Sequence, residues 1–289
     1  MPDRAILITG GTGYLGRRIV RRASGMNRIY VGSNRAAVQA PAGEIVFLDI
    51  GDRSSVISCV QQVQPSVIVH AAAVNPGQGD YEAMWRVNAD GARHIAAAAT
   101  RVGARLIAIS TDVVHDGTAA PYADDTPATP INIYGRTKAA AEDSILDIDP
   151  SAVVVRTSLM YGLDTMDRST AEFADRLVRN EHLQLFTDVV RNPIWVETLA
   201  QAIVRLADTD VSGLLNIAGR QAVTREDYAR KLLAHWDIDD RGLIEPVRAA
   251  EISDTIPLDL RLDSTRAEEL LGMPFPGIDE VLAGNRRPR

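Results

Sequence analysis

The chain has 289 residues, of which 46% are hydrophobic and 24% charged, a composition that is ordinary for a globular protein and excludes extensive disorder. The net charge of -7 argues against nucleic acid or an anionic membrane as the main partner, because both require a positive surface. The single cysteine, Cys59, excludes an internal disulfide and a cysteine metal cluster, and no apolar run is long enough to span a membrane, so we expect a cytoplasmic protein without a metal.

Short β-branched runs alternate with helical patterns through the first half of the chain. The predicted strands cover residues 5–9, 28–32, 44–49, 66–71, 105–110 and 152–157. The predicted helices cover residues 14–25, 52–63, 80–102 and 134–147. Alternation of this kind is typical of parallel sheets with right-handed crossovers. The predicted fold class is therefore α/β, with a doubly wound parallel sheet of the Rossmann type.

The pattern is looser after about residue 160. Its predicted helices cover residues 170–180, 195–207 and 224–237, and its predicted strands cover residues 183–187 and 213–217. We therefore predict a Rossmann domain over 1–160 and a smaller C-terminal lobe over 161–283, with some return of the chain to the sheet. Residues 284–289 are predicted to form a disordered tail.

A glycine-rich turn follows the first predicted strand. Gly10, Gly13 and Gly16 have the spacing G-x-x-G-x-x-G at the start of a predicted helix. Glycines at these places permit a tight turn and the close approach of a pyrophosphate to the helix N-terminus. The turn therefore predicts that the first domain binds a dinucleotide, and the alternative is a turn without a ligand.

The end of the second strand bears on the choice of cofactor. It carries Ser33, Asn34 and Arg35 and lacks the acidic residue that would bind a ribose 2′-hydroxyl. With Arg17, these side chains suit the extra phosphate of NADP, so we prefer NADP to NAD. Asp49 is placed either to meet the adenine or to cap a turn. The predicted cofactor-binding residues are Gly10, Thr12, Gly13, Tyr14, Leu15, Gly16, Ser33, Asn34, Arg35, Asp49, Ile50, Ala71, Ala72, Ala73, Asn88, Ser110, Tyr134 and Lys138.

Lys138 is one of only two lysines among 31 basic residues, and Tyr134 precedes it by four positions. On a helix the two side chains share a face. The lysine can lower the pKa of the tyrosine and bind a nicotinamide ribose, which would make the phenol an acid near neutral pH. Thr111, at the end of the predicted strand 105–110, lies where ligands bind in open α/β sheets. Asn88 either orients this site or caps and packs a helix.

Six segments occur in a fixed order: "TGGTGYLG", "VIVHAAAV", "VNADG", "STDVVHDG", "YGRTK" and "VVVRTSLMYG". With "LDIGD" and the distal "LDLRLDSTRAEELLG", they resemble the extended short-chain dehydrogenases/reductases, and among these the dTDP-4-dehydrorhamnose reductase family. The resemblance implies that Thr111, Tyr134 and Lys138 are catalytic. NADPH or NADH would reduce the 4-keto group of a nucleotide-linked 6-deoxysugar, and Tyr134 would supply the proton. It also implies a homodimer formed through the two alanine-rich helices and a sugar site under the C-terminal lobe.

The substrate side departs from the family pattern. Val113 stands where similar 4,6-dehydratases carry an acidic residue, so dehydration is not expected. Leu159 and the segment around Trp195 also differ from the family. Two alternatives therefore stay open: a reductase of another small carbonyl compound, and a non-catalytic NADP-binding subunit similar to the regulatory subunit of methionine adenosyltransferase. The predicted substrate-binding residues are Asp112, Val113, Leu159, Arg191 and Trp195.

Several basic side chains have two interpretations. Arg156, Arg191 and Arg261 either bind a diphosphate or carboxylate or form ion pairs within the protein. His115 either approaches the active site or is a structural residue, and the structural role is the commoner one for a lone histidine.

Overall fold

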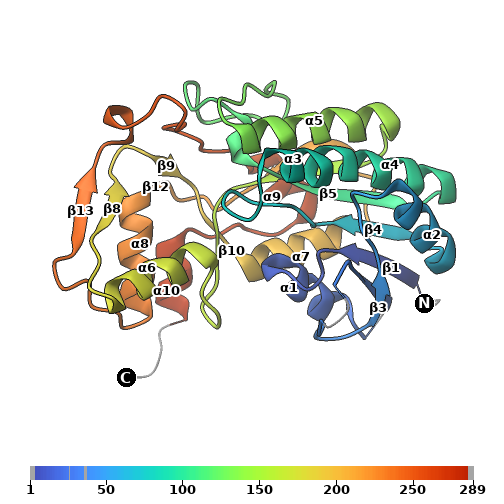
Figure 1. The fold of residues 1–289 in the computed structure, drawn as a ribbon, viewed down its shortest axis with the longest axis horizontal. Helices are drawn as coiled ribbons and strands as arrows, with labels where there is room; N and C mark the ends of the chain where they lie inside the picture. The colour runs from blue at the N-terminus through green and yellow to red at the C-terminus, as the bar shows by residue number, and fades with distance from the viewer. Residues whose placement is uncertain (1–3, 26, 36–37, 286–289) are drawn as a thin grey trace.

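The fold was analysed in a computed structural model that describes residues 4–25, 27–35 and 38–285. A seven-stranded parallel sheet lies at its centre, with the strand order β11-β6-β5-β4-β1-β2-β3 (Figure 1). The order proceeds in both directions from β1, which is the doubly wound arrangement, so the predicted fold class is confirmed. The strands are β1 (Arg4–Thr9), β2 (Asn27–Ser33), β3 (Glu44–Phe47), β4 (Val67–His70), β5 (Arg105–Thr111), β6 (Val153–Thr157) and β11 (Gly213–Ile217).

Helices cover both faces of this sheet. One face packs against α1 (Tyr14–Ala23) and α7 (Val196–Leu206), and their side chains share one hydrophobic core with the strands. The other face packs against α2 (Arg53–Val63), α4 (Gly91–Val102) and α5 (Ile133–Ile148). Because both faces are covered, the strands β4 and β6 are buried along their whole length, which explains their continuous apolar sequences.

The predicted helix 80–102 is continuous but not regular. It consists of α3 (Tyr81–Met84), the wider π-helical turn η1 (Trp85–Asp90) and α4. A π turn admits one extra residue and often lies at a functional site. Here it contains Asn88, one of the predicted site residues.

The C-terminal part of the chain forms a smaller body beside the carboxyl ends of the strands, on the left in Figure 1. It contains three two-stranded sheets, which pair β7 with β10, β9 with β12 and β8 with β13. Their bounds are β7 (Met160–Tyr161), β8 (Leu183–Phe186), β9 (Val190–Arg191), β10 (Ile194–Trp195), β12 (Val223–Thr224) and β13 (Ile244–Val247). Its helices are α6 (Arg168–Val178), α8 (Arg225–His235) and α10 (Ile278–Gly284), and it also contains the 3₁₀ turn η3 (Ala249–Glu251). Helix α9 (Thr265–Leu271) packs instead against β11 and α7, and the 3₁₀ turn η2 (Asp112–Val114) directly follows β5.

The chain crosses between the two bodies more than once. β11 pairs with β6 at the edge of the central sheet, as the expected return to the sheet requires. Helix α10 reaches Gly284, so the first residue of the predicted tail is helical, while residues 286–289 lie outside the described residues. Within the described part of the chain, no helix combines the length and the hydrophobicity needed to cross a membrane.

Candidate functional site

The glycine-rich turn has the geometry that a dinucleotide requires. Gly10 has a φ of +68°, and a Cβ atom there would lie 2.7 Å from the backbone nitrogen of Ala72. A Cβ atom on Gly16 would lie 2.1 Å from the carbonyl oxygen of Gly10. Helix α1 begins at Tyr14 without a side-chain cap, so its first N–H groups are left for an anion. The glycines thus let the turn pack tightly against Ala72 and α1, and the uncapped N–H groups of α1 fit the pyrophosphate of a dinucleotide.

Two neighbours of this turn contribute in different ways. The Leu15 side chain is buried in the core, so only its backbone is left for a cofactor. The Tyr14 hydroxyl donates to the carbonyl oxygen of Thr165 at 3.1 Å, and its ring lies 4.2 Å from the Arg18 guanidinium. Tyr14 thus joins the first helix of the sheet to the loop that leads into α6.

The end of β2 lies beside the glycine-rich turn. Asn34 and Arg35 are exposed, while Ser33 is buried and its hydroxyl accepts a 3.1 Å hydrogen bond from the Arg35 N–H. Arg17 donates to the carbonyl oxygens of Thr12 and Gln39, both at 2.9 Å. Arg17 therefore ties the turn to the segment that follows β2 and places a cation between them.

Asp49 and Ile50 follow β3. The Asp49 carboxylate accepts the Gly51 N–H at 2.9 Å, which is the turn-capping alternative, and its second oxygen lies 3.5 Å from Arg86. The Ile50 side chain is buried in the core beneath α4. A cofactor could therefore reach Asp49, which is partly exposed, but only the backbone of Ile50.

The end of β4 is held by two polar side chains. The Thr9 hydroxyl lies 2.8 Å from Nδ1 of His70 and accepts the Ala72 N–H at 3.2 Å. Asn88 accepts the Val74 N–H at 2.8 Å and donates to the Val74 carbonyl oxygen at 3.0 Å and to Thr137 at 3.1 Å. Asn88 is buried, so its side chain fixes the backbone of Val74, directly after Ala71–Ala73, and does not face an open site.

The three predicted catalytic residues come from the end of β5 and the start of α5. Asn132 caps α5 by accepting the Gly135 N–H at 2.8 Å, which places Tyr134 and Lys138 on successive turns. The Lys138 ammonium donates to the Ile109 carbonyl oxygen at 2.8 Å. Thr111 ends β5, is partly exposed, and donates to the Asp112 carboxylate at 3.2 Å.

The pKa of Tyr134 beside Lys138 differs from the expectation. Burial, followed by the negative charge of Asp112, raises the pKa of the Tyr134 phenol to about 12. Burial also lowers the pKa of the Lys138 ammonium to about 8, against the opposing charge of Glu142. The expected lowering of the Tyr134 pKa is absent, because burial and the Asp112 charge both act to raise it. A phenol with a raised pKa is protonated at neutral pH, the state that a proton donor needs.

Ser110 does not face the cofactor side of the strand. Its hydroxyl donates to the Glu142 carboxylate, and Glu142 forms a 2.7 Å ion pair with Arg156. Arg156 is 1% exposed, so it is not available to a substrate anion. His115 is also buried and stacks on Tyr122 at 3.9 Å, which is the structural role.

The predicted substrate residues fall into two groups. Asp112 is 2% exposed, accepts from Arg191 at 2.7 Å and from Ser158 at 2.7 Å, and so positions Arg191 instead of facing a substrate. Val113, Leu159 and Trp195 are partly buried side chains of the apolar clusters beneath the C-terminal lobe. Outside this set, Arg261 pairs with Asp259 at 2.7 Å.

Sequence reasoning missed Arg225. It directly follows β12, which pairs antiparallel with β9 so that Val223 lies opposite Arg191. Burial, and then the positive charge of Arg191, lower the pKa of the Arg225 guanidinium. Among the described residues Arg225 forms no ion pair; its guanidinium lies 5.8 Å from the Tyr228 ring, and the negative charges of Asp167 and Asp112 act on it from further away. The signal was a cation in the first turn of a helix, where the helix dipole disfavours positive charge.

The arrangement can therefore bind a dinucleotide along β1 and β4, hold a proton at Tyr134 and offer two guanidinium groups to an anion. No group of three or more histidine, cysteine, aspartate or glutamate side chains within the described ranges is arranged to hold a metal ion.

Comparison with known proteins gives the family. The family model described as RmlD substrate binding domain matches residues 4–283. A dTDP-4-keto-6-deoxy-D-glucose reductase from Streptomyces niveus is 36% identical over 262 residues, which are 88% of this chain and 85% of that protein. Methionine adenosyltransferase 2 subunit beta from Bos taurus is 28% identical over an alignment of 302 positions that covers 98% of this chain and 88% of that protein.

A solved structure gives the same result. The dTDP-4-dehydrorhamnose reductase from Bacillus anthracis str. Ames, in complex with NADP, is 25% identical, with a TM-score of 0.83 and 98% of each chain covered. Since the family model spans almost the whole described chain, the resemblance drawn from the motifs is confirmed, and the protein belongs to the RmlD substrate binding domain family.

Proposed function

We propose that the protein is an NAD(P)H-dependent reductase of the 4-keto group of a nucleotide-linked 6-deoxysugar, with NADP preferred. The observation that carries the proposal is the convergence of Thr111, Tyr134 and Lys138 at the carboxyl end of β5, two strands from the glycine-rich turn. The names of the relatives from Streptomyces niveus and Bacillus anthracis support the same chemistry.

Each catalytic side chain has a separate role in the proposed reaction. A bound reduced nicotinamide supplies the hydride. Tyr134 gives its proton to the carbonyl oxygen as that oxygen becomes negative, so the products are a secondary alcohol and a tyrosinate that is reprotonated from solvent. Thr111 donates to the same oxygen, and the Lys138 ammonium stabilises the tyrosinate and binds the ribose. The cofactor would rest on the glycine-rich turn, with its 2′-phosphate near Arg17 and Arg35.

The substrate would lie between the sheet and the C-terminal lobe. We infer that residues 1–160 bind the dinucleotide and that residues 161–283 form the substrate lobe. Arg191 and Arg225 supply positive charge for the diphosphate of the substrate, and Leu159 and Trp195 border the sugar. We also infer a cytoplasmic homodimer formed through α4 and α5, whose alanine side chains allow close packing of helices.

A second function is favoured by one observation. The likeness to methionine adenosyltransferase 2 subunit beta covers 98% of the chain, more than the 88% covered by the Streptomyces relative. A non-catalytic NADP-binding subunit would keep the glycine-rich turn but would not need Thr111, Tyr134 and Lys138 together, so we prefer the enzyme.

One assay separates the two functions. NADPH and NADH oxidation are followed by absorbance with a dTDP-4-keto-6-deoxyhexose generated in the same tube. We expect turnover, faster with NADPH, and a loss of about 10²–10⁴-fold in Tyr134→Phe. Tight NADPH binding by the wild-type protein without any oxidation would instead favour the regulatory subunit.

A further inference from the structure

Ser110 and Arg156 are neighbours across the sheet. They are paired Cα partners in the β5–β6 register, so their side chains lie next to each other on the same face. Both reach the Glu142 carboxylate on α5: Ser110 donates through its hydroxyl, and Arg156 donates through Nε at 3.1 Å and Nη2 at 2.7 Å. One carboxylate therefore joins two strands to the helix of the site.

Glu142 continues the row of catalytic side chains. Tyr134, Lys138 and Glu142 are spaced by four residues and share one face of α5. Lys138 bonds to the Ile109 carbonyl oxygen and Glu142 bonds to Ser110. Two consecutive residues of β5 are thus bonded to two consecutive turns of α5, directly before Thr111.

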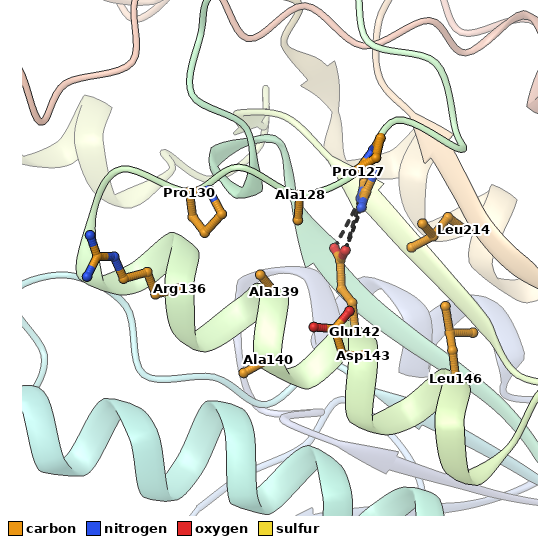
Figure 2. Close-up of a pocket in the computed structure, with 11 residues that line it drawn as sticks. Pro127, Ala128, Pro130, Arg136, Ala139, Ala140, Glu142, Asp143, Leu146 and Leu214 are labelled. Atoms are coloured by element: carbon orange, nitrogen blue, oxygen red, sulfur yellow. Dashed lines mark hydrogen bonds and ion pairs between the residues drawn. The ribbon is translucent and has the colours of Figure 1, made fainter.

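The same pair holds the connection that leads into α5. The Arg156 guanidinium also donates to the carbonyl oxygens of Thr126 at 2.8 Å and Asp124 at 3.3 Å. The Glu142–Arg156 pair borders a surface cavity of about 510 Å³ between α5 and the loop at Pro127 and Pro130; dashed lines mark the contacts of Glu142 (Figure 2). The pair is nevertheless buried, with Glu142 3% exposed.

Burial of the Glu142–Arg156 ion pair costs free energy, because both charged groups lose their hydration. A buried ion pair can often be replaced by apolar side chains of similar volume without loss of stability. An apolar pair would fill this space but would leave the Ser110 hydroxyl without an acceptor and β5 without its bond to α5.

We propose that Glu142 is a positioning residue: held by Arg156, it binds Ser110 and so fixes the distance between Thr111 on β5 and Tyr134 and Lys138 on α5. The inference rests on the proposed reductase function, because it concerns the geometry of that reaction. Glu142 is 3% exposed and its carboxylate bonds to Ser110 and Arg156, so it acts through these residues.

The sharpest variant is Ser110→Ala, which removes the bond to Glu142 and leaves the ion pair intact. We expect kcat to fall about tenfold, with the KM for NADPH and the melting temperature nearly unchanged. Ser110→Thr restores a hydroxyl and should restore kcat. Asp143→Asn is the matched control, since Asp143 is the exposed carboxylate next to Glu142 on α5, and it should keep the wild-type kcat.

Glu142→Gln alone leaves a buried guanidinium without its counter-charge and destabilises the fold. The double variant Glu142→Leu with Arg156→Met removes both charges and also the acceptor of the Ser110 hydroxyl, so it tests the same bond without leaving one charge buried alone. Wild-type kcat in Ser110→Ala, or in the folded double variant, would overturn the proposal.

A second measurement does not depend on turnover. The chain has only Lys138 and Lys231, so protein labelled with ¹³C at the lysine ε-carbon gives two resonances, which Lys231→Arg assigns. The groups that face the Lys138 ammonium are Glu142 on α5, His70 on β4 and the Ile109 carbonyl oxygen on β5.

Loss of the Glu142 charge should move the titration midpoint of Lys138 downward by about one pH unit in the double variant, and Asp143→Asn should not move it. An unchanged midpoint would contradict the placement of Glu142 beside Lys138. If the wild-type protein oxidises no cofactor, the reductase function fails, while this titration still decides whether Glu142 is coupled to Lys138.

Discussion

The ammonium group of Lys138 donates a 2.8 Å hydrogen bond to the carbonyl oxygen of Ile109, so the helix that carries Tyr134 is bonded to the strand that ends at Thr111. Lys138 is 5% exposed. A planar guanidinium is larger than an ammonium and directs its donors in one plane, so arginine would not reproduce this bond in a closed site. This hydrogen bond explains why a chain with 31 lysines and arginines, of which only two are lysines, has a lysine at position 138.

Lys138→Arg should therefore lose turnover while it still binds cofactor. We expect kcat to fall by about a hundredfold or more, since the phenol loses the group that stabilises its tyrosinate. NADPH oxidation measures the loss, and NADPH fluorescence measures binding. Lys231→Arg is the matched control, because Lys231 is more exposed and its ammonium pairs with Asp279 at 2.7 Å. Full activity in Lys138→Arg would refute the assignment.

Local patterns were sufficient to predict the fold, and they supplied most of the candidate site residues. The glycine spacing at Gly10 and Gly16 and the Tyr134–Lys138 interval depend on short segments, and the strands β1 to β6 could be predicted from their apolar runs. Side-chain hydrogen bonds between residues far apart in the sequence could not be predicted from local patterns. The bond from Ser110 to Glu142 and that from Arg191 to Asp112 join residues 32 and 79 positions apart, and only tertiary packing brings them together.

Two buried histidines should make the protein sensitive to acid. Burial, and then the charge of Arg156, lower the pKa of His115 to about 4, and burial, and then the charge of Lys138, lower that of His70 to about 3. The unfolded chain binds these protons near pH 6.5, so the free energy of unfolding falls as the pH falls below that value. Between pH 6.5 and 5 each histidine costs about 2 kcal/mol.

His115→Phe tests this linkage. The substitution keeps a ring on Tyr122 and removes one of the two titrating groups, so its free energy of unfolding should fall by about 2 kcal/mol less than that of the wild-type protein between pH 6.5 and 5. Urea unfolding at both pH values measures the difference. Equal losses in the two proteins would show that His115 is protonated in the folded state.

Arg225 should act on the substrate and not on the cofactor. Arg225→Gln removes a cation that has no ion-pair partner within the described chain, so the KM for an anionic substrate should rise about ten- to a hundredfold. The KM for NADPH should stay the same. Arg220→Gln is the control, because Arg220 is exposed and pairs with Glu268 at 3.4 Å. An unchanged substrate KM in Arg225→Gln would remove Arg225 from the site.

Gly16 gives the strictest test of the cofactor turn. A Cβ atom there would lie 2.1 Å from the Gly10 carbonyl oxygen and 2.7 Å from Gly11 Cα, and both are backbone atoms of the turn, so α1 and the turn must move apart. Gly16→Ala should therefore lower the free energy of unfolding by about 1–3 kcal/mol and weaken NADPH binding, because the displaced helix no longer presents its N–H groups to the pyrophosphate.

Gly284→Ala is the control for this substitution, since a Cβ atom on Gly284, in α10, would meet no atom within 4 Å. Fluorescence titration and thermal unfolding of both variants separate the two effects. Wild-type NADPH affinity in Gly16→Ala would mean that the close packing of α1 on the turn does not determine cofactor binding, and that the pyrophosphate is held mainly by side chains such as Arg17.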